Sequence, residues 1–191
     1  YHIENPSQES QLDAYLEKAL LPALHRNGVP KVGVFKPIAS QPDAGKKVYL
    51  LIPYASMKVY SEMEGKLAKD QAYQAAGTAY INAPFDNPPY RRIETAFLQA
   101  FTGHPRFSES KLTGPKKDRV YELRSYESAS EKIYRKKVEM FNKGGEIKLF
   151  ERLNFNAVFY GEVIAGTRMP NLMYLTTFEN KTDRDVHWKA F

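Results

Sequence analysis

The sequence contains no cysteine among its 191 residues. This absence excludes a disulfide scaffold, a thiol nucleophile and a thiolate zinc site. A chain of this length buries roughly 70% of the surface that its unfolded form exposes, so its core needs no such cross-links. Long hydrophobic runs are lacking too, since no apolar stretch approaches the roughly 20 residues of a membrane-spanning helix. The sequence therefore predicts a soluble protein with no transmembrane segment, in a compartment that it does not indicate.

Motifs for catalysis and for metal binding are also lacking. The glycines form neither a Gly-x-Gly-x-x-Gly nor a Walker pattern, and no serine lies in a Gly-x-Ser-x-Gly turn. No two histidines have the spacing that would put both imidazoles on one face of a strand or helix; the four are His2, His25, His104 and His187. We therefore expect no metal site and no cofactor.

A concentrated positive charge is absent as well. The 28 Lys and Arg residues exceed the 22 acidic ones, which gives a net charge of +6. The basic residues are spread along the chain, and the densest groups are Arg135-Lys136-Lys137 and Lys116-Lys117. Proteins that bind nucleic acids usually concentrate such charge in one patch with aromatic side chains among it. We therefore expect no nucleic-acid partner.

Both ends of the sequence look incomplete. The first residues, Tyr1-His2-Ile3, resemble the tail of a strand, and the last, Val186–Phe191, resemble an unfinished helix. We therefore expect the natural polypeptide to extend at both ends. No signal peptide is visible, although an exported protein that has lost an N-terminal segment fits the same pattern.

A long amphipathic helix is the clearest element of the first half. Its apolar residues recur at helical spacing: Leu12, Tyr15, Leu16, Ala19, Leu20, Ala23 and Leu24. Ser10 with Asp13 resembles a capping box, and Asn27-Gly28 is a stop signal. Pro22 within the stripe predicts a kink or a restart of the helix.

Two strands, a helix and a third strand follow this long helix. The strands Pro30–Ile38 and Lys47–Tyr54 predict a hairpin, and Ser56 begins a helix with Val59, Tyr60, Met63 and Leu67 inward. Alternation over 91–101 predicts a closing strand, after a proline-rich loop. The polar stretch 102–118 is the best boundary between two halves, which gives a first domain at 1–110 and a second at 118–191.

The second half repeats this order of elements. A strand at 120–126 precedes a helix that begins with Ser128 and Glu131, and Gly144-Gly145 predicts a break in that helix or a close approach of another backbone. A hairpin follows from 156 to 178 across Gly166-Thr167-Arg168, and Thr182 with Asp185 begins a last helix. The fold class predicted by this duplication is α+β, with two ferredoxin-like β-α-β-β-α-β halves.

Three segments of the second half resemble one known family. The strand Val120-Tyr121-Glu122-Leu123-Arg124-Ser125-Tyr126 is similar to the opening strand of a NIPSNAP domain. The tail Asp183–Trp188 resembles that family's helix start, and Phe159–Glu162 with Leu172–Leu175 resembles its central hairpin. The resemblance covers 118–191, with 1–101 as a more divergent copy.

The resemblance implies a dimeric α/β-barrel arrangement, in which two ferredoxin-like units place their sheets face to face. Two halves of one chain, or a homo-oligomer, would supply the two sheets. The resemblance also places the chain beside a wider superfamily that includes cofactor-independent monooxygenases and haem-handling enzymes and shares no catalytic signature. Fold analogy alone therefore assigns no activity.

Strand periodicity selects the candidate ligand-binding residues. The charged face of the first strand of the second half carries Glu122, Arg124 and Tyr126, and we expect it to line the space between the sheets. Tyr160 with Glu162, and Tyr174, should converge on it from the next two strands. The set suits a polar pocket for an anionic group. It also suits a structural ion pair between two sheets, of Arg124 with Glu122 or Glu162, since buried charges need partners whatever their function.

Three functions are compatible with this sequence. The first is a binding or interaction module that holds a small organic ligand between two sheets. The second is an enzyme of the cofactor-independent monooxygenase kind, acting on a hydrophobic or aromatic substrate. The third, haem binding, would need an iron ligand inside the barrel.

Overall fold

The computed structural model describes residues 1–191, and its chain divides into two units, Tyr1–Glu94 and Thr95–Phe191. Each unit combines helices with antiparallel strands, so the predicted α+β class is confirmed. The division falls earlier in the chain than the polar stretch 102–118. That stretch lies within the second unit, where the Ser108 N–H donates to the Val158 carbonyl at 2.9 Å.

The first unit begins with one long helix in three parts, α1 (Pro6–Tyr15), a π-helical turn (Leu16–Leu20) and α2 (Leu21–Arg26). The π turn ends two residues before Pro22, which lies in the first turn of α2. This confirms the predicted interruption, because proline has no N–H for the helical ladder. The whole predicted apolar stripe is buried. The helix ends at Asn27-Gly28 as predicted, and Gly28 takes a φ of 87°, which favours glycine.

The predicted start of this helix at Ser10 was wrong. The Asn5 side chain caps the helix by accepting from the Gln8 N–H at 2.9 Å, and Pro6 occupies the first turn. An asparagine cap followed by proline is the stronger start signal, because proline at this position loses no hydrogen bond.

Four short extended segments form the strand layer of the first unit. Strands β1 (Gly33–Phe35) and β2 (Tyr49–Leu51) pair as the predicted antiparallel hairpin, but each is only three residues long. His2 bridges to Lys47 on one side and to Arg92 on the other. The segments therefore lie in the order 33–35, 47–51, 1–3 and 91–92.

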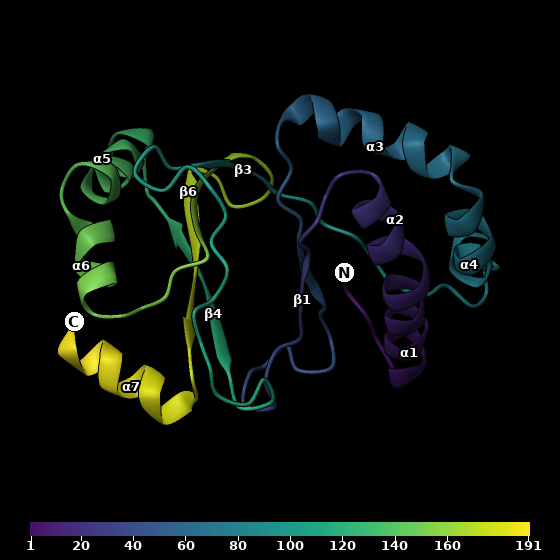
Figure 1. Ribbon diagram of the computed structural model, residues 1–191, viewed down its shortest axis with the longest axis horizontal. Helices are drawn as coiled ribbons and strands as arrows, with labels where there is room; N and C mark the ends of the chain where they lie inside the picture. The colour runs from purple at the N-terminus through teal and green to yellow at the C-terminus, as the bar shows by residue number, and fades with distance from the viewer. The chain divides into compact units, whose positions relative to one another are not determined.

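Two more helices complete the first unit, α3 (Met57–Lys69) and α4 (Gln71–Ile81). Ser56 caps α3 as predicted and Met63 is buried, but Tyr60, predicted to point inward, is 37% exposed. Helix α4 was not predicted. Asp70 ends α3 and caps α4 by accepting from the Tyr73 N–H at 2.9 Å. Helices α1, α2 and α4 lie to one side of β1 (Figure 1).

The second unit contains a four-stranded antiparallel sheet in the order β3-β5-β6-β4. Its strands are β3 (Phe97–Ala100), β4 (Val120–Glu127), β5 (Phe159–Ala165) and β6 (Asn171–Phe178). Strand β3 corrects a prediction, because 97–100 was assigned to the first half and pairs instead with β5. Alternation identifies a strand but does not identify the strand with which it pairs.

Three helices cover one face of this sheet, α5 (Glu131–Asn142), α6 (Glu146–Arg152) and α7 (Lys181–Ala190) (Figure 1). Gly144 and Gly145 separate α5 from α6, which confirms the predicted break. The caps of α5 and α7 are Ser130 and Asn180, so the predicted starts at Ser128 and Thr182 were each two residues out. In both cases the side chain that accepts from the first turn's N–H decides the boundary.

Candidate functional site

The six predicted ligand-binding residues do share one face of the second sheet. Tyr174 lies opposite Arg124 on one neighbouring strand and opposite Tyr160 on the other. Cross-strand partners point to the same face, and residues two apart on one strand do so as well. Glu122, Tyr126 and Glu162 therefore lie on this face with them.

The side of the sheet on which they lie was predicted wrongly. Tyr126, Tyr160 and Tyr174 belong to an aromatic cluster with Phe141 of α5 and Phe150 of α6. The shared face is thus the one beneath the unit's own helices, and not a face left open toward another sheet. The prediction took charged side chains as a sign of an open interior, but the helices supply partners for these charges.

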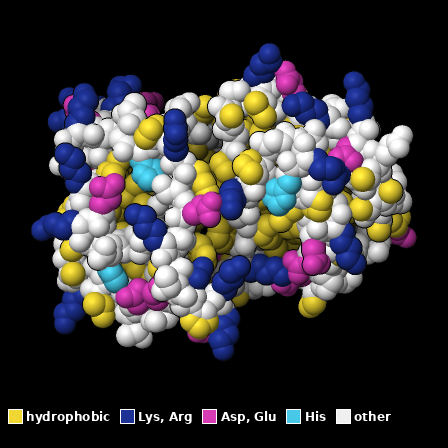
Figure 2. All heavy atoms as spheres, in the orientation of Figure 1, with side chains coloured by type: hydrophobic (Ala, Val, Ile, Leu, Met, Phe, Trp, Pro, Cys, Tyr) yellow, Lys and Arg dark blue, Asp and Glu magenta, His cyan; other side chains and the backbone are white.

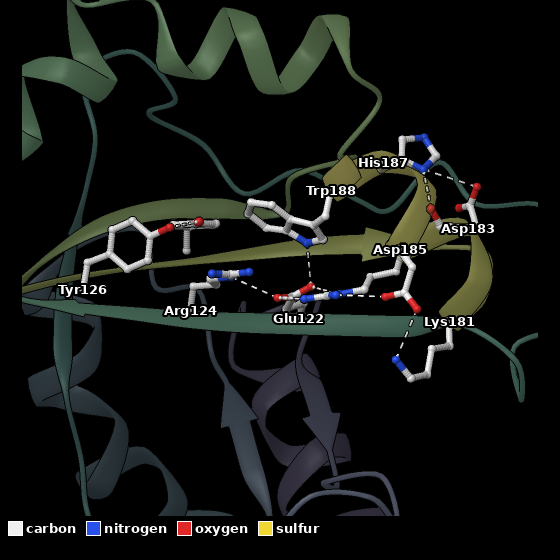
Figure 3. Close-up of polar contacts among 10 residues, drawn as sticks. Glu122, Arg124, Tyr126, Lys181, Asp183, Asp185, His187 and Trp188 are labelled. Carbon is white, nitrogen blue, oxygen red and sulfur yellow. Dashed lines mark hydrogen bonds and ion pairs between the residues drawn. The ribbon is translucent and has the colours of Figure 1, made fainter. Parts of the chain in front are cut away.

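Glu122 is the centre of the polar contacts on this face (Figure 3). Its Oε1 accepts from Arg124 Nε at 2.9 Å and from Arg184 Nη2 at 2.8 Å. Its Oε2 accepts from Arg184 Nε at 2.7 Å and from Trp188 Nε1 at 2.9 Å. Each carboxylate oxygen therefore receives two hydrogen bonds, which is its full capacity.

The charges around Glu122 favour its ionised form. Burial by itself would raise the pKa of Glu122, but hydrogen bonds from Arg184 and Trp188 and the charge of Arg124 hold that pKa below its ordinary value. The Arg184 pKa is raised, chiefly by its hydrogen bond to Glu122. The Arg124 guanidinium also lies 4.0 Å from the centre of the Trp188 ring, a cation–π distance.

Two members of this arrangement, Arg184 and Trp188, were not predicted as partners of Glu122. They are four residues apart on α7, so they point to the same side of the helix. The sequence pattern of this segment predicted a helix and a family resemblance, but neither pointed to Glu122. Helical spacing of an arginine and a tryptophan, opposite a strand that carries Glu-x-Arg, is a signal that could have identified the contact.

The tyrosine hydroxyls of this face differ in their partners. The Tyr126 and Tyr174 hydroxyls lie 2.8 Å apart, and the Tyr134 hydroxyl of α5 donates to Glu162 Oε2 at 2.9 Å. Tyr160 is 1% exposed and its hydroxyl has no hydrogen-bond partner. Burial raises the pKa of Tyr134, Tyr160 and Tyr174, so these phenols stay protonated at neutral pH.

These contacts limit the chemistry available beneath the helices. A carboxylate that accepts four hydrogen bonds has no free lone pair for a substrate proton, and phenols with raised pKa values are poor bases. The structure contains no group of three His, Asp or Glu side chains that could hold a metal ion. This cluster therefore matches the alternative function-free interpretation, a structural ion pair between Arg124 and Glu122. The pair lies between a sheet and its own helices, and not between two sheets.

Surface features add no site at these residues. One open hollow is lined by Lys136, Glu139 and Met140 of α5, and a second by Leu16, Leu21 and His25 of the first unit. On the face seen in Figure 2, Lys and Arg side chains are dispersed among acidic and uncharged ones. None of the helices is both long enough and apolar enough to cross a membrane.

No known family model matches the chain, and no curated protein is similar enough in sequence to match it.

Proposed function

We propose that this chain is a NIPSNAP-like binding module that holds a small organic molecule against the helix-free faces of its sheets. Each unit would be a ferredoxin-like half, and two such faces would enclose the ligand in a dimeric α/β-barrel arrangement. The resemblance in strand β4 and helix α7 motivates the family, and the strand orders within the two units support the fold.

The strand orders support the β-α-β-β-α-β plan for four strands of the first unit and for β4, β5 and β6 of the second, where β3 is an additional strand beside β5. In such a split βαβ unit the third strand lies between the first and the second. In the second unit β6, the third strand of the predicted half, lies between β4 and β5. In the first unit the segment 47–51 lies between 1–3 and 33–35. The segment 91–92 adds the fourth strand beside the first.

The single observation that carries the proposal is the apolar character of the second sheet's helix-free face. Leu123 of β4 is 40% exposed and lies opposite Leu175 of β6, which lies opposite Phe159 of β5. Met173 continues this face along β6. None of these residues belongs to the aromatic cluster beneath the helices. Part of this face is already buried, since Leu175 is 3% exposed and the Ser110 hydroxyl lies 2.9 Å from that of Thr177 on the same face. Apolar residues that stay accessible outside the helices, Leu123 foremost, are typical of a contact or ligand surface.

The chemistry of this face favours binding over catalysis. Its side chains are mainly aliphatic and aromatic, whereas the ionised residues of the unit's interior are saturated on the opposite face. We therefore expect a largely apolar ligand with few polar groups. A cofactor-independent monooxygenase would use the same face for its substrate. We rank this function second because no observed contact favours it over binding.

A fluorescent apolar probe, anilinonaphthalene sulfonate, tests this proposal on the intact chain. Met173→Glu places a charge at the centre of the face, and we expect it to weaken probe binding by about tenfold, since burying a methionine contributes roughly 1.5–3 kcal/mol. Met57→Glu on α3 is the matched control, because Met57 is 54% exposed on a helix. Equal binding by both variants, or no binding by the wild type, would refute the proposal.

A further inference from the structure

A segment without helix or strand crosses the helix-free face of the second sheet. Residues 101–119 connect β3 to β4 and contain no regular element. Connections longer than about 12–15 residues without secondary structure are uncommon in compact units, and many of them are lids or binding loops. The Ser108 N–H donates to the Val158 carbonyl beside β5 at 2.9 Å, and the Ser110 hydroxyl lies 2.9 Å from that of Thr177 in β6. We call residues 108–119 the strap.

The strap covers part of the face that the proposed ligand would use. Thr177 lies opposite Tyr121 of β4, so its side chain is on the same face as Leu123. Thr177 is fully buried although the unit's helices lie on the other face, and its contact with Ser110 shows that the strap supplies this cover. Leu175, two residues away on the same face, is 3% exposed, whereas Leu123 is 40% exposed. The face is therefore partly covered and partly accessible.

Charged side chains hold the strap from two directions. The Glu179 carboxylate, directly after β6, accepts from the Thr113 N–H and from the Gly114 N–H, both at 2.8 Å. The Arg119 guanidinium, directly before β4, donates to the Leu112 carbonyl at 3.0 Å and to the Gly114 carbonyl at 2.8 Å. The strap thus presents two consecutive N–H groups to an anion and two carbonyls to a cation. Hydrogen bonds to charged groups are stronger than those between neutral groups.

Few apolar contacts hold the strap besides these bonds. Leu112 is the one buried residue within it, and Leu112 belongs to neither core cluster. Gly114 allows the close approach of Glu179, because a Cβ on Gly114 would lie 2.6 Å from the Glu179 Oε2. Segments with few buried apolar contacts open locally at a lower free energy than the core does. The closed position of the strap therefore depends mainly on the carboxylate and the guanidinium.

We propose that the strap is a displaceable cover over the helix-free face, and that the Glu179 carboxylate keeps it closed. This role rests on the proposed function, because the strap regulates access to the same face. When the two N–H bonds to the carboxylate break, the strap moves away from Thr177 and uncovers the apolar residues beside it, Leu175 foremost. An apolar ligand that uses this area binds the open form, so ligand binding and strap opening are linked.

Limited digestion with trypsin measures strap opening in the intact chain. Lys111 lies in the strap and is exposed. In Glu179→Gln an uncharged amide replaces the carboxylate, so we expect cleavage after Lys111 to be about tenfold faster, because cleavage follows the population of the open form. Glu127→Gln is the matched control, since Glu127 lies in the same sheet and pairs with the side chain of Arg168. Unchanged cleavage in Glu179→Gln, or an equal increase after Lys148 of α6, would overturn the proposal.

A reversible cross-link tests whether the strap covers the helix-free face. The Ser110 and Thr177 hydroxyls are 2.9 Å apart, so cysteines at these two positions are within reach of a disulfide in a chain that has no other cysteine. We expect the oxidised Ser110→Cys/Thr177→Cys variant to bind anilinonaphthalene sulfonate about threefold more weakly than the same variant reduced with dithiothreitol, because the disulfide removes the open form. Equal binding by the two forms, or no disulfide after oxidation, would overturn the proposal.

The cover and the proposed function fail in different ways. If the wild type binds the probe and Met173→Glu weakens that binding, but neither Glu179→Gln nor the disulfide changes cleavage or binding, the proposed function stands and the cover is refuted. If no form of the chain binds the probe, the proposed function is refuted, and the role of the strap as a cover is refuted with it, whatever the cleavage rates show.

Discussion

The two units place their elements in a similar order but are stabilised in different ways. In the first unit the strands are three residues long, and the buried core centres on the stripe of the long helix. In the second unit strands of seven and eight residues support a cluster of aromatic rings beneath three helices. Two units with a similar order of elements can therefore form their buried cores mainly around a helix or mainly against a sheet.

The two units also differ in their buried polar groups. Each unit contains a pair of tyrosine hydroxyls 2.8 Å apart, Tyr15 with Tyr73 and Tyr126 with Tyr174. Only the second unit adds a carboxylate that connects a strand to its last helix, through Glu122, Arg184 and Trp188. Helix α7 is therefore held by hydrogen bonds to Glu122 as well as by ring contacts of Trp188 with Phe150 and Phe155, whereas the long helix of the first unit is held mainly by apolar contact.

The largest expected effect comes from Phe141→Ala in the second unit. Phe141 is 1% exposed, and its ring lies among the surrounding aromatic rings. Its loss should lower the free energy of unfolding by about 4 kcal/mol. Urea titration followed by fluorescence of Trp188, the single tryptophan, reports this unit directly.

Leu24→Ala is the matched change in the first unit, since Leu24 is also 1% exposed. We expect a loss of about 3 kcal/mol, seen by circular dichroism, with the Trp188 transition unchanged. A single transition that both variants shift equally would show that the units unfold as one, and would break the comparison.

A smaller effect is expected from Glu122→Gln. The change leaves two arginines and a tryptophan N–H without their ionised acceptor, so the second unit should lose about 2 kcal/mol. Glu139→Gln on α5 is the control, because the Glu139–Lys143 pair is exposed and contributes little. An equal loss in both variants would contradict a special role for Glu122.

Acid titration tests the contribution of Glu122 to stability independently. The pKa of Glu122 is lower in the folded chain than its ordinary value of 4.5, so the unfolded chain binds the proton more tightly. The stability that this carboxylate contributes is present above the ordinary value and is lost as the pH falls through the lowered one. The difference in the free energy of unfolding between wild type and Glu122→Gln should therefore be constant near neutral pH and become smaller in acid.

The smallest expected effect compares two helix caps. The Asn5 side chain accepts from the Gln8 N–H at 2.9 Å, whereas Ser130 accepts from the Ile133 N–H at 3.4 Å. Asn5→Ala should cost about 1 kcal/mol, and Ser130→Ala distinctly less. Thermal unfolding measures both, and a larger loss at Ser130 would contradict the comparison of the two bonds.

Local patterns predicted much of the fold and part of the site. The stripe from Leu12 to Leu24, the interruption at Pro22 and the shared strand face of Glu122 and Arg124 were confirmed, because each depends on spacing within a short segment. Helix α4 and the partner of strand β3 were missed. The NIPSNAP resemblance, the ligand and the barrel arrangement stay predictions.

By itself the sequence determined which side chains share a face, because the periods of strands and helices are properties of the backbone. Only the tertiary structure decided which face of the second sheet the helices cover. The two-residue period of a strand shows that its side chains alternate between two faces, but it does not show which face the helices cover. The distinction depends on Arg184 and Trp188, about 60 residues along the chain from Glu122, reaching its carboxylate.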